Sequence, residues 1–300
     1  MFLIIATGML SRHFGVLSRE DVPGYNRSAF RVFVPCLLFY NVYTSDLSSA
    51  VRPKLILFAV CGVLAVFLFA VLYVRRFEPH PDRKGVVAQA IFRSNYVIMG
   101  IPIAQVLVGQ ENLGPVSILI AVIVPLFNFL AVYVLERFRG GRIEPGKIFV
   151  QILKNPLIIS SVLGILCLLF SIRLPRLLED GIRSLGNVGT TLQLFLLGAF
   201  FDFKGLRRYR ADLTRVTFIK LILSPAVMLS LAALLGFRGV EFVALLGIFA
   251  SPAAINSFTM VQQMHCGDAE LAGDIVISTS AFSMFSFFLW ILLFRALGMF

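Results

Sequence analysis

The sequence predicts an all-α integral membrane protein, and three observations support this fold class. The 300 residues are 58% hydrophobic and only 14% charged, with a mean hydropathy of +0.89, whereas soluble domains are close to half apolar and a quarter charged. Apolar stretches follow one another along the chain, and they are too long and too poor in polar alternation to be strands. Most approach the roughly 20 residues that a helix needs to cross a bilayer. Little is left for a soluble domain.

Ten transmembrane helices are expected, and the first is short. It has neither a basic leader nor a small-residue cleavage site, so we interpret it as a truncated first span and not as a signal peptide. The ten stretches are residues 1–14, 27–44, 55–74, 86–109, 114–135, 148–171, 186–202, 213–236, 240–264 and 272–297.

The net charge of +11 lies in short clusters between the apolar stretches, such as Arg75-Arg76 and Arg207-Arg208. These clusters are interpreted as topology signals and not as a nucleic-acid surface. If the loops alternate sides, most basic residues fall on one side, which should be the cytoplasmic one. The sequence therefore predicts a multi-pass protein of the plasma membrane with both termini outside the cytoplasm.

The two halves of the sequence resemble each other weakly. A shift of 157 positions places Ile91, Phe92, Ser94 and Gln105 over Ile248, Phe249, Ser251 and Gln262. With five spans in each half, the second copy enters the membrane from the opposite side, as in the inverted repeats of secondary transporters. The expected division is a first repeat at 1–137, a cytoplasmic linker at 138–147 and a second repeat at 148–300.

The fourth and ninth stretches are interrupted by proline, glycine and polar residues, and we expect both helices to be broken there. Proline removes a backbone donor and clashes with the preceding turn, and freed backbone groups at membrane depth need protein or a wet cavity around them. Two such breaks would direct positive helix N-terminal ends at one cavity, which favours an anion. The alternative is that the prolines only kink two continuous helices. The expected substrate-binding residues are Arg93, Ser94, Asn95, Pro102, Ser251, Pro252 and Asn256.

Arg93 is the strongest candidate, because an arginine in the middle of a span is energetically unfavourable and its guanidinium suits a carboxylate. The alternative is that Arg93 extends to the cytoplasmic edge or bonds a local carbonyl. Asn95 and Asn256 would bond the substrate or join helices. Lys220 is expected to extend to the basic edge of its helix, and His265 is expected to face cytoplasmic water.

No Asp or Glu lies in the middle of an expected span, and Asp274 is the nearest exception. Any ion coupling would therefore have to use backbone carbonyls or neutral side chains. The four cysteines lack zinc or disulfide spacing, and there is no phosphate loop, zinc motif or nucleophile elbow. We expect no enzyme activity, no cofactor and no metal site.

Several segments resemble the auxin efflux carrier family, which lies within the bile acid/arsenite/riboflavin transporter superfamily. The similarity extends over essentially the whole length and is most specific in the fourth and ninth stretches. The segments are Gly15-Val16-Leu17-Ser18, Val34-Pro35-Cys36-Leu37-Leu38, Ser94-Asn95, Met99-Gly100-Ile101-Pro102, Ser251-Pro252, Gln262-Gln263-Met264 and Gly267-Asp268-Ala269-Glu270-Leu271-Ala272.

This resemblance implies two inverted five-helix repeats with helices four and nine crossing at the substrate site. Asn95, Pro102 and Pro252 match the asparagine and prolines of the two crossovers. Family members move organic anions, including auxin in plants and dicarboxylates such as malate or malonate in bacteria. Here Ser94 replaces the proline usual in plant members, and the central loop is short, which favours a compact bacterial-type member. Thr191 stands where a proline is expected, so helix seven should be straighter than usual.

The sequence thus predicts a secondary carrier for a small carboxylate, working by alternating access against a scaffold of helices one, two, six and seven. Two alternatives stay open: a sodium-coupled symporter of the bile acid type, and a membrane sensor or channel. The expected partners are the anion and the lipid bilayer, with no nucleic acid, and a homodimer is left open.

Overall fold

The computed structural model describes residues 1–45, 52–109, 112–139 and 145–300. The linker expected at 138–147 therefore lies partly outside the described residues. Within the described ranges the chain forms helices and their connections, with one isolated antiparallel bridge between Ser94 and Ala253. The all-helical prediction is confirmed for these residues.

The first half contains α1 (Phe2–His13), α2 (Val22–Ser28), α3 (Val34–Tyr43), α4 (Pro53–Phe77), α5 (Pro81–Phe92), α6 (Ile101–Val108) and α7 (Gly114–Arg137). The second half contains α8 (Pro145–Lys154), α9 (Pro156–Leu169), α10 (Arg176–Phe200), α11 (Phe203–Arg208), α12 (Arg210–Phe218), α13 (Ser224–Leu234), α14 (Gly239–Ala250), α15 (Asn256–Met264) and α16 (Ala269–Ala296).

Among the residues that the structure describes, four helical segments are long and apolar enough to cross a membrane: α4, α7, the continuous run Arg210–Leu234, and α16. Shorter apolar helices cover Tyr96–Val108, α9 and α14.

In the described part of the chain, three wide π-helical turns interrupt the helical runs: η1 (Ala29–Phe33), η2 (Tyr96–Gly100) and η4 (Ile219–Leu223). Each precedes a proline by the same spacing. Pro35, Pro102 and Pro225 each occupy the second position of the α-helix that follows. Since a proline ring clashes with the carbonyl four residues earlier, widening the preceding turn relieves that contact. In contrast α10, which carries Thr191 and no proline, is one uninterrupted helix of 25 residues without such a turn.

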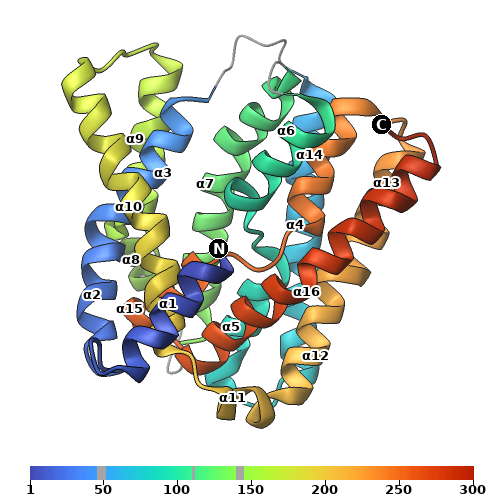
Figure 1. The fold of residues 1–300 in the computed structure, drawn as a ribbon. Coiled ribbons are helices and arrows are strands. Elements are labelled where there is room, and N and C mark those ends of the chain that lie inside the picture. Colours follow the sequence, from blue (N-terminus) through green and yellow to red (C-terminus); the bar gives the residue numbers. More distant parts are fainter. Residues whose placement is uncertain (46–51, 110–111, 140–144) are drawn as a thin grey trace.

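The helices form two groups (Figure 1). Helices α1, α3, α9 and α10 pack chiefly on one another, and α4 to α7 pack with α12 to α16. Glycine allows the closest approach in the first group: a Cβ atom at Gly198 of α10 would lie 2.0 Å from the carbonyl oxygen of Ile5 in α1. The first group corresponds to the helices expected to form the scaffold.

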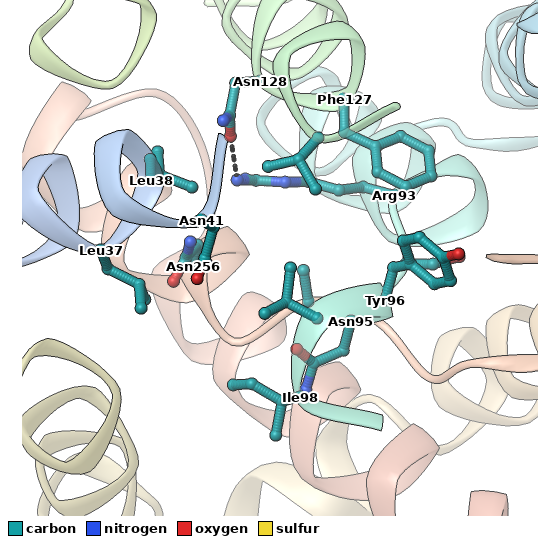
Figure 2. A pocket seen from close by; sticks show the side chains of 14 residues that line it. Leu37, Leu38, Asn41, Arg93, Asn95, Tyr96, Ile98, Phe127, Asn128 and Asn256 are labelled. Carbon is teal, nitrogen blue, oxygen red and sulfur yellow. Dashed lines mark hydrogen bonds between the residues drawn. The ribbon is translucent and has the colours of Figure 1, made fainter. Parts of the chain in front are cut away.

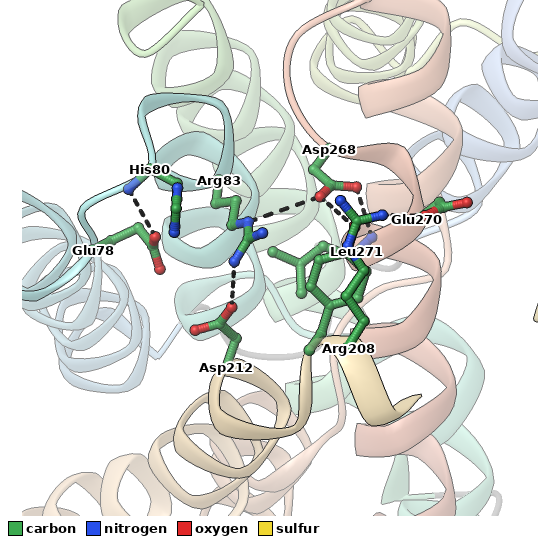
Figure 3. A network of polar contacts seen from close by, with 9 residues as sticks. Glu78, His80, Arg83, Arg208, Asp212, Asp268, Glu270 and Leu271 are labelled. Carbon is green, nitrogen blue, oxygen red and sulfur yellow. Dashed lines mark hydrogen bonds and ion pairs between the residues drawn. The ribbon is translucent and has the colours of Figure 1, made fainter. Parts of the chain in front are cut away.

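Asp268 has a structural role at the end of the molecule where α11 lies (Figures 1 and 3). The Asp268 carboxylate accepts the Leu271 N–H at the start of α16 at 3.0 Å and the Tyr209 hydroxyl at 2.7 Å. Burial, together with the Asp268 carboxylate, raises the pKa of Tyr209. Arg83 of α5 lies 3.0 Å from Asp212 and 3.9 Å from Asp268, so this network joins α5, α12 and α16.

Candidate functional site

The two interrupted helices meet in the interior of the protein. Helix α5 ends at Phe92 and α14 ends at Ala250, and each is followed by a short non-helical segment before the next helical turn begins. The backbone N–H of Asn95 donates to the carbonyl oxygen of Pro252 at 2.9 Å, beside the Ser94–Ala253 bridge. The predicted breaks are therefore confirmed, and the alternative of simple kinks is wrong.

A small cavity of about 50 Å³ lies at this crossing, enough for a few water molecules or the head of a short acid. Its walls come from α3, from α7 and from the two interruptions, so it lies between the two helix groups (Figure 2). The lining residues with polar side chains are Asn41, Arg93, Ser94, Asn95, Tyr96, Asn128 and Asn256.

Arg93 is buried beside this cavity, with 3% of its surface exposed. One terminal nitrogen donates to the Asn128 side-chain oxygen at 2.6 Å (Figure 2). The other donates to the Met260 sulfur at 2.6 Å. Among the residues that the structure describes, no carboxylate forms an ion pair with it. The alternative in which Arg93 extends to the membrane edge is wrong, because the guanidinium points inward between α7 and α15.

Two helical segments begin at the cavity. The turn η2 starts at Tyr96, directly after Asn95, and α15 starts at Asn256. The first turn of a helix carries partial positive charge, although in α15 the N–H groups of Ser257 and Phe258 already donate to the carbonyl oxygens of Ala254 and Ile255 at 2.9 and 3.1 Å. The side-chain nitrogen of Asn95 is also buried and has no hydrogen-bond partner in the described part of the chain. All of these groups suit a negatively charged or carbonyl-rich ligand.

The expected site residues divide into two sets. Arg93, Ser94, Asn95 and Asn256 line the cavity. The other three are not among its lining residues: Pro102 is exposed in α6, Ser251 is buried with its hydroxyl bonded to the Gly247 carbonyl, and Pro252 presents its carbonyl to Asn95.

Sequence reasoning missed Asn41 and Asn128. Asn128 lies in the apolar helix α7, where it accepts from Arg93 and its amide nitrogen lies 3.4 Å from the Ser161 hydroxyl. Asn41 lies near the end of α3. The signal was present in both cases, since a lone amide in an apolar stretch needs a polar partner.

The expectation that Lys220 extends to the membrane edge is wrong. Its side chain is 1% exposed and donates to the Ile91 carbonyl at 3.2 Å and to the Ser94 hydroxyl oxygen at 2.6 Å. The reason lies in the break of α5: the Ile91 carbonyl would normally accept from Asn95 four residues later, but that N–H bonds Pro252 instead. Lys220 supplies the missing donor from η4.

Two residues outside the crossing bear on the other expectations. His265 is exposed at the end of α15, with a φ of 50°, in agreement with a position facing water. Asp274 is buried in the first turns of α16, and its Oδ2 atom has no hydrogen-bond partner within residues 1–45, 52–109, 112–139 and 145–300. A Cβ atom at Gly205 would lie 2.2 Å from that oxygen.

The chain is similar to known transporters over nearly its whole length. It is 24% identical over 293 residues to an "Uncharacterized transporter" of Methanothermobacter thermautotrophicus, covering 97% of this chain and 95% of the relative. It is 22% identical over 303 residues to "Uncharacterized transporter MJ1031" of Methanocaldococcus jannaschii, with the same coverage. A "Putative malonate transporter" of Rhizobium meliloti is 24% identical over 299 residues, covering 91% of each chain.

One family model, described as "Membrane transport protein", matches residues 1–150 and again residues 142–291. Two successive matches of one model are consistent with an internal duplication. The matches cover almost the entire chain and confirm the resemblance that the crossover residues indicated. This multi-pass membrane protein belongs to the membrane transport protein family, the family of the auxin efflux carriers.

Proposed function

We propose that this chain is a secondary carrier that moves a small carboxylate across the plasma membrane, with malonate as the first candidate substrate. The observation that carries the proposal is the buried Arg93 guanidinium, which lies beside a cavity without an acidic partner in the described structure. A buried charge without a counterion costs several kcal/mol. A substrate carboxylate would supply that counterion.

The other groups at the cavity support an anion. Asn95 and Asn256 stand where η2 and α15 begin, so a carboxylate there would meet amide donors and the positive ends of two helical segments. Asn128 would hold the guanidinium in place, because its side-chain oxygen already accepts from Arg93. Pro102 and Pro252 would act through the backbone by keeping the two helices open.

The position of the cavity supports alternating access. We propose ten spans in two inverted repeats, residues 1–137 and 148–300, with both termini outside the cytoplasm. The group formed by α4 to α7 and α12 to α16 would move against α1, α3, α9 and α10. Asn41 belongs to the group of α1, α3, α9 and α10, and Arg93 belongs to the group of α4 to α7 and α12 to α16. Relative movement of the two groups would therefore open the cavity to one side at a time.

The size of the cavity favours a short acid. About 50 Å³ is small for a substrate of bile acid size, which makes that class the weaker candidate. The relative from Rhizobium meliloti, whose printed name refers to malonate, supports a dicarboxylate as the first compound to try.

Uptake of radiolabelled malonate into proteoliposomes tests the proposal. Arg93→Gln should lower uptake at subsaturating malonate by about 10- to 150-fold, which corresponds to losing one charge-assisted contact of about 1.5–3 kcal/mol. The matched control is Arg52→Gln, because Arg52 forms an exposed ion pair with Glu241 away from the cavity; it should transport normally. Wild-type activity in Arg93→Gln would exclude the assigned role.

A second measurement separates the carrier from the remaining alternatives. Unlabelled mono- and dicarboxylates should compete with malonate, and their rank would identify the preferred acid. If no acid competes and no labelled malonate enters, the substrate class is wrong. Currents far above carrier turnover in a planar bilayer would instead favour a channel.

A further inference from the structure

The end of α5 has the composition of a cation site. The Ile91 carbonyl has lost its helical donor, since the Asn95 N–H is used in the crossing, and the Ser94 hydroxyl lies next to it. Both oxygens stand at the C-terminal end of a helix, where the helix dipole is negative. Carriers with broken helices coordinate a coupling sodium ion through this kind of backbone and hydroxyl oxygen.

The amino group of Lys220 occupies this position beside the Ile91 carbonyl and the Ser94 hydroxyl. Its Nζ atom contacts both oxygens, at 3.2 Å and 2.6 Å, and its side chain is almost completely buried. No acidic side chain in the described part of the chain forms an ion pair with it. The acceptors of Lys220 are therefore neutral oxygens, as they would be for a bound cation.

We propose that the Lys220 amino group is a tethered substitute for the coupling cation, so that transport by this chain requires no sodium. The inference rests on the proposed carrier function, and it disfavours the sodium-coupled alternative. Lys220 is held by η4, the wide turn that Pro225 imposes on the run from α12 to α13. That turn places the side chain against the crossing.

Ser94 connects this cation to the anion cavity. Its hydroxyl oxygen accepts from Lys220, so its own hydrogen remains available as a donor, and Ser94 also lines the cavity. A positive group behind Ser94 makes that hydroxyl a better donor to a carboxylate. Lys220 is thus a positioning residue, which acts on the substrate through Ser94.

The first test measures cation dependence without any transport assay. Wild-type protein should unfold at the same temperature in sodium chloride and in choline chloride of equal ionic strength. Lys220→Ala removes the propylammonium part of the side chain and leaves its space open. Its melting temperature should fall by several degrees and should recover when propylammonium chloride or sodium chloride, but not choline chloride, is present.

The matched control is Lys54→Ala. Lys54 also donates from a helix to a carbonyl, that of Leu235, at 2.7 Å, but it lies at an exposed helix end. Propylammonium should not raise the melting temperature of this variant. Equal recovery of both variants would overturn the proposal, as would a wild-type melting temperature that rises with sodium.

The second test uses malonate uptake. Wild-type uptake should be unchanged when an inward sodium gradient is replaced by choline. Lys220→Met, which keeps most of the side-chain length without the charge, should lose at least about tenfold. Several-fold stimulation of the wild type by sodium, or normal uptake by Lys220→Met, would contradict the tethered cation. If the wild type moves no malonate, the proposed substrate fails, while the melting temperatures still decide the role of Lys220.

Discussion

The backbone N–H of Asn95 donates to the carbonyl oxygen of Pro252, a backbone bond that joins the two halves of the chain at the crossing. It takes the donor that would have continued α5, which leaves the Ile91 carbonyl for Lys220. In the other interrupted segment, which follows α14, the Ala253 N–H donates to the Thr279 hydroxyl oxygen of α16 at 3.2 Å. Each interrupted segment is thus held by a bond from outside its own helix.

Thr279→Val should loosen the second segment. Valine has nearly the same shape but no acceptor, so the buried Ala253 N–H would lose its partner at a cost of about 1–3 kcal/mol. We expect a lower melting temperature and slower malonate uptake. Thr279→Ser keeps the hydroxyl and serves as the control. Indistinguishable Val and Ser variants would mean that this bond does not hold the crossing.

The sequence was sufficient to locate the breaks, because Pro252 and the polar residues of both interruptions are local signals, whereas Pro102 lies beyond the first break and widens the turn η2. It also predicted that Arg93 would face the interior, since an unpaired arginine is costly in a membrane. Asn95 and Asn256 were chosen as polar amides within the two interrupted stretches, and the structure places each at the start of a helical segment.

The positions of Lys220 and Asn128 could not be predicted from their neighbours in the sequence, because both depend on contacts with distant residues. The interior position of Lys220 follows from the loss of the Ile91 helical bond, which in turn follows from a bond between residues 95 and 252. Without that contact, a lysine near the basic end of a helix is better interpreted as extending to water. Asn128 in α7 could equally have joined two helices until the structure placed Arg93 beside it.

Gly198→Ala should destabilise the contact between α1 and α10. A Cβ atom there would lie 2.0 Å from the Ile5 carbonyl oxygen and 2.8 Å from its carbonyl carbon, so the two helices must separate. We expect a loss of about 1–3 kcal/mol, typical of overpacking. Gly181 lies in the same helix, and a Cβ atom added there would meet nothing within 4 Å, so Gly181→Ala should be neutral or stabilising by up to about 1 kcal/mol. Equal melting temperatures for the two variants would contradict this packing.

Trp290→Phe should destabilise the protein, because it removes the N–H donor that replaces the one Pro225 lacks. Proline has no N–H, so the Leu221 carbonyl four residues earlier lacks its usual helical donor, and the Trp290 indole N–H donates to it at 2.9 Å. Removing the indole should cost about 1–3 kcal/mol. In a Pro225→Ala background the helix can supply its own donor, so the same change should cost less. Additive effects in this double-mutant cycle would mean that the two features are independent.

Cys266 should resist alkylation in the folded protein up to high pH. Burial, reinforced by the neighbouring Glu136, raises the pKa of its thiol to about 12, against an ordinary value of about 8.5. Since the thiolate is the reactive form, and its fraction stays far below that of an ordinary thiol between pH 7 and 9, the folded protein should be labelled much more slowly than the unfolded chain throughout this range. The unfolded chain loses this proton first, so the same shift lowers the free energy of unfolding as the pH rises above about 8.5.

A variant with Cys36, Cys61 and Cys167 replaced by alanine isolates the Cys266 signal. Iodoacetamide labelling of this variant should be slow between pH 7 and 9 when it is folded. After denaturation it should be fast and rise about tenfold per pH unit below the ordinary thiol pKa. Glu136→Gln should bring only a small increase, because burial is the larger cause of the shift. Rapid labelling of the folded protein at pH 8 would mean that the turn between α15 and α16 opens, which would release the Sγ contact with the Met264 carbonyl at 3.1 Å.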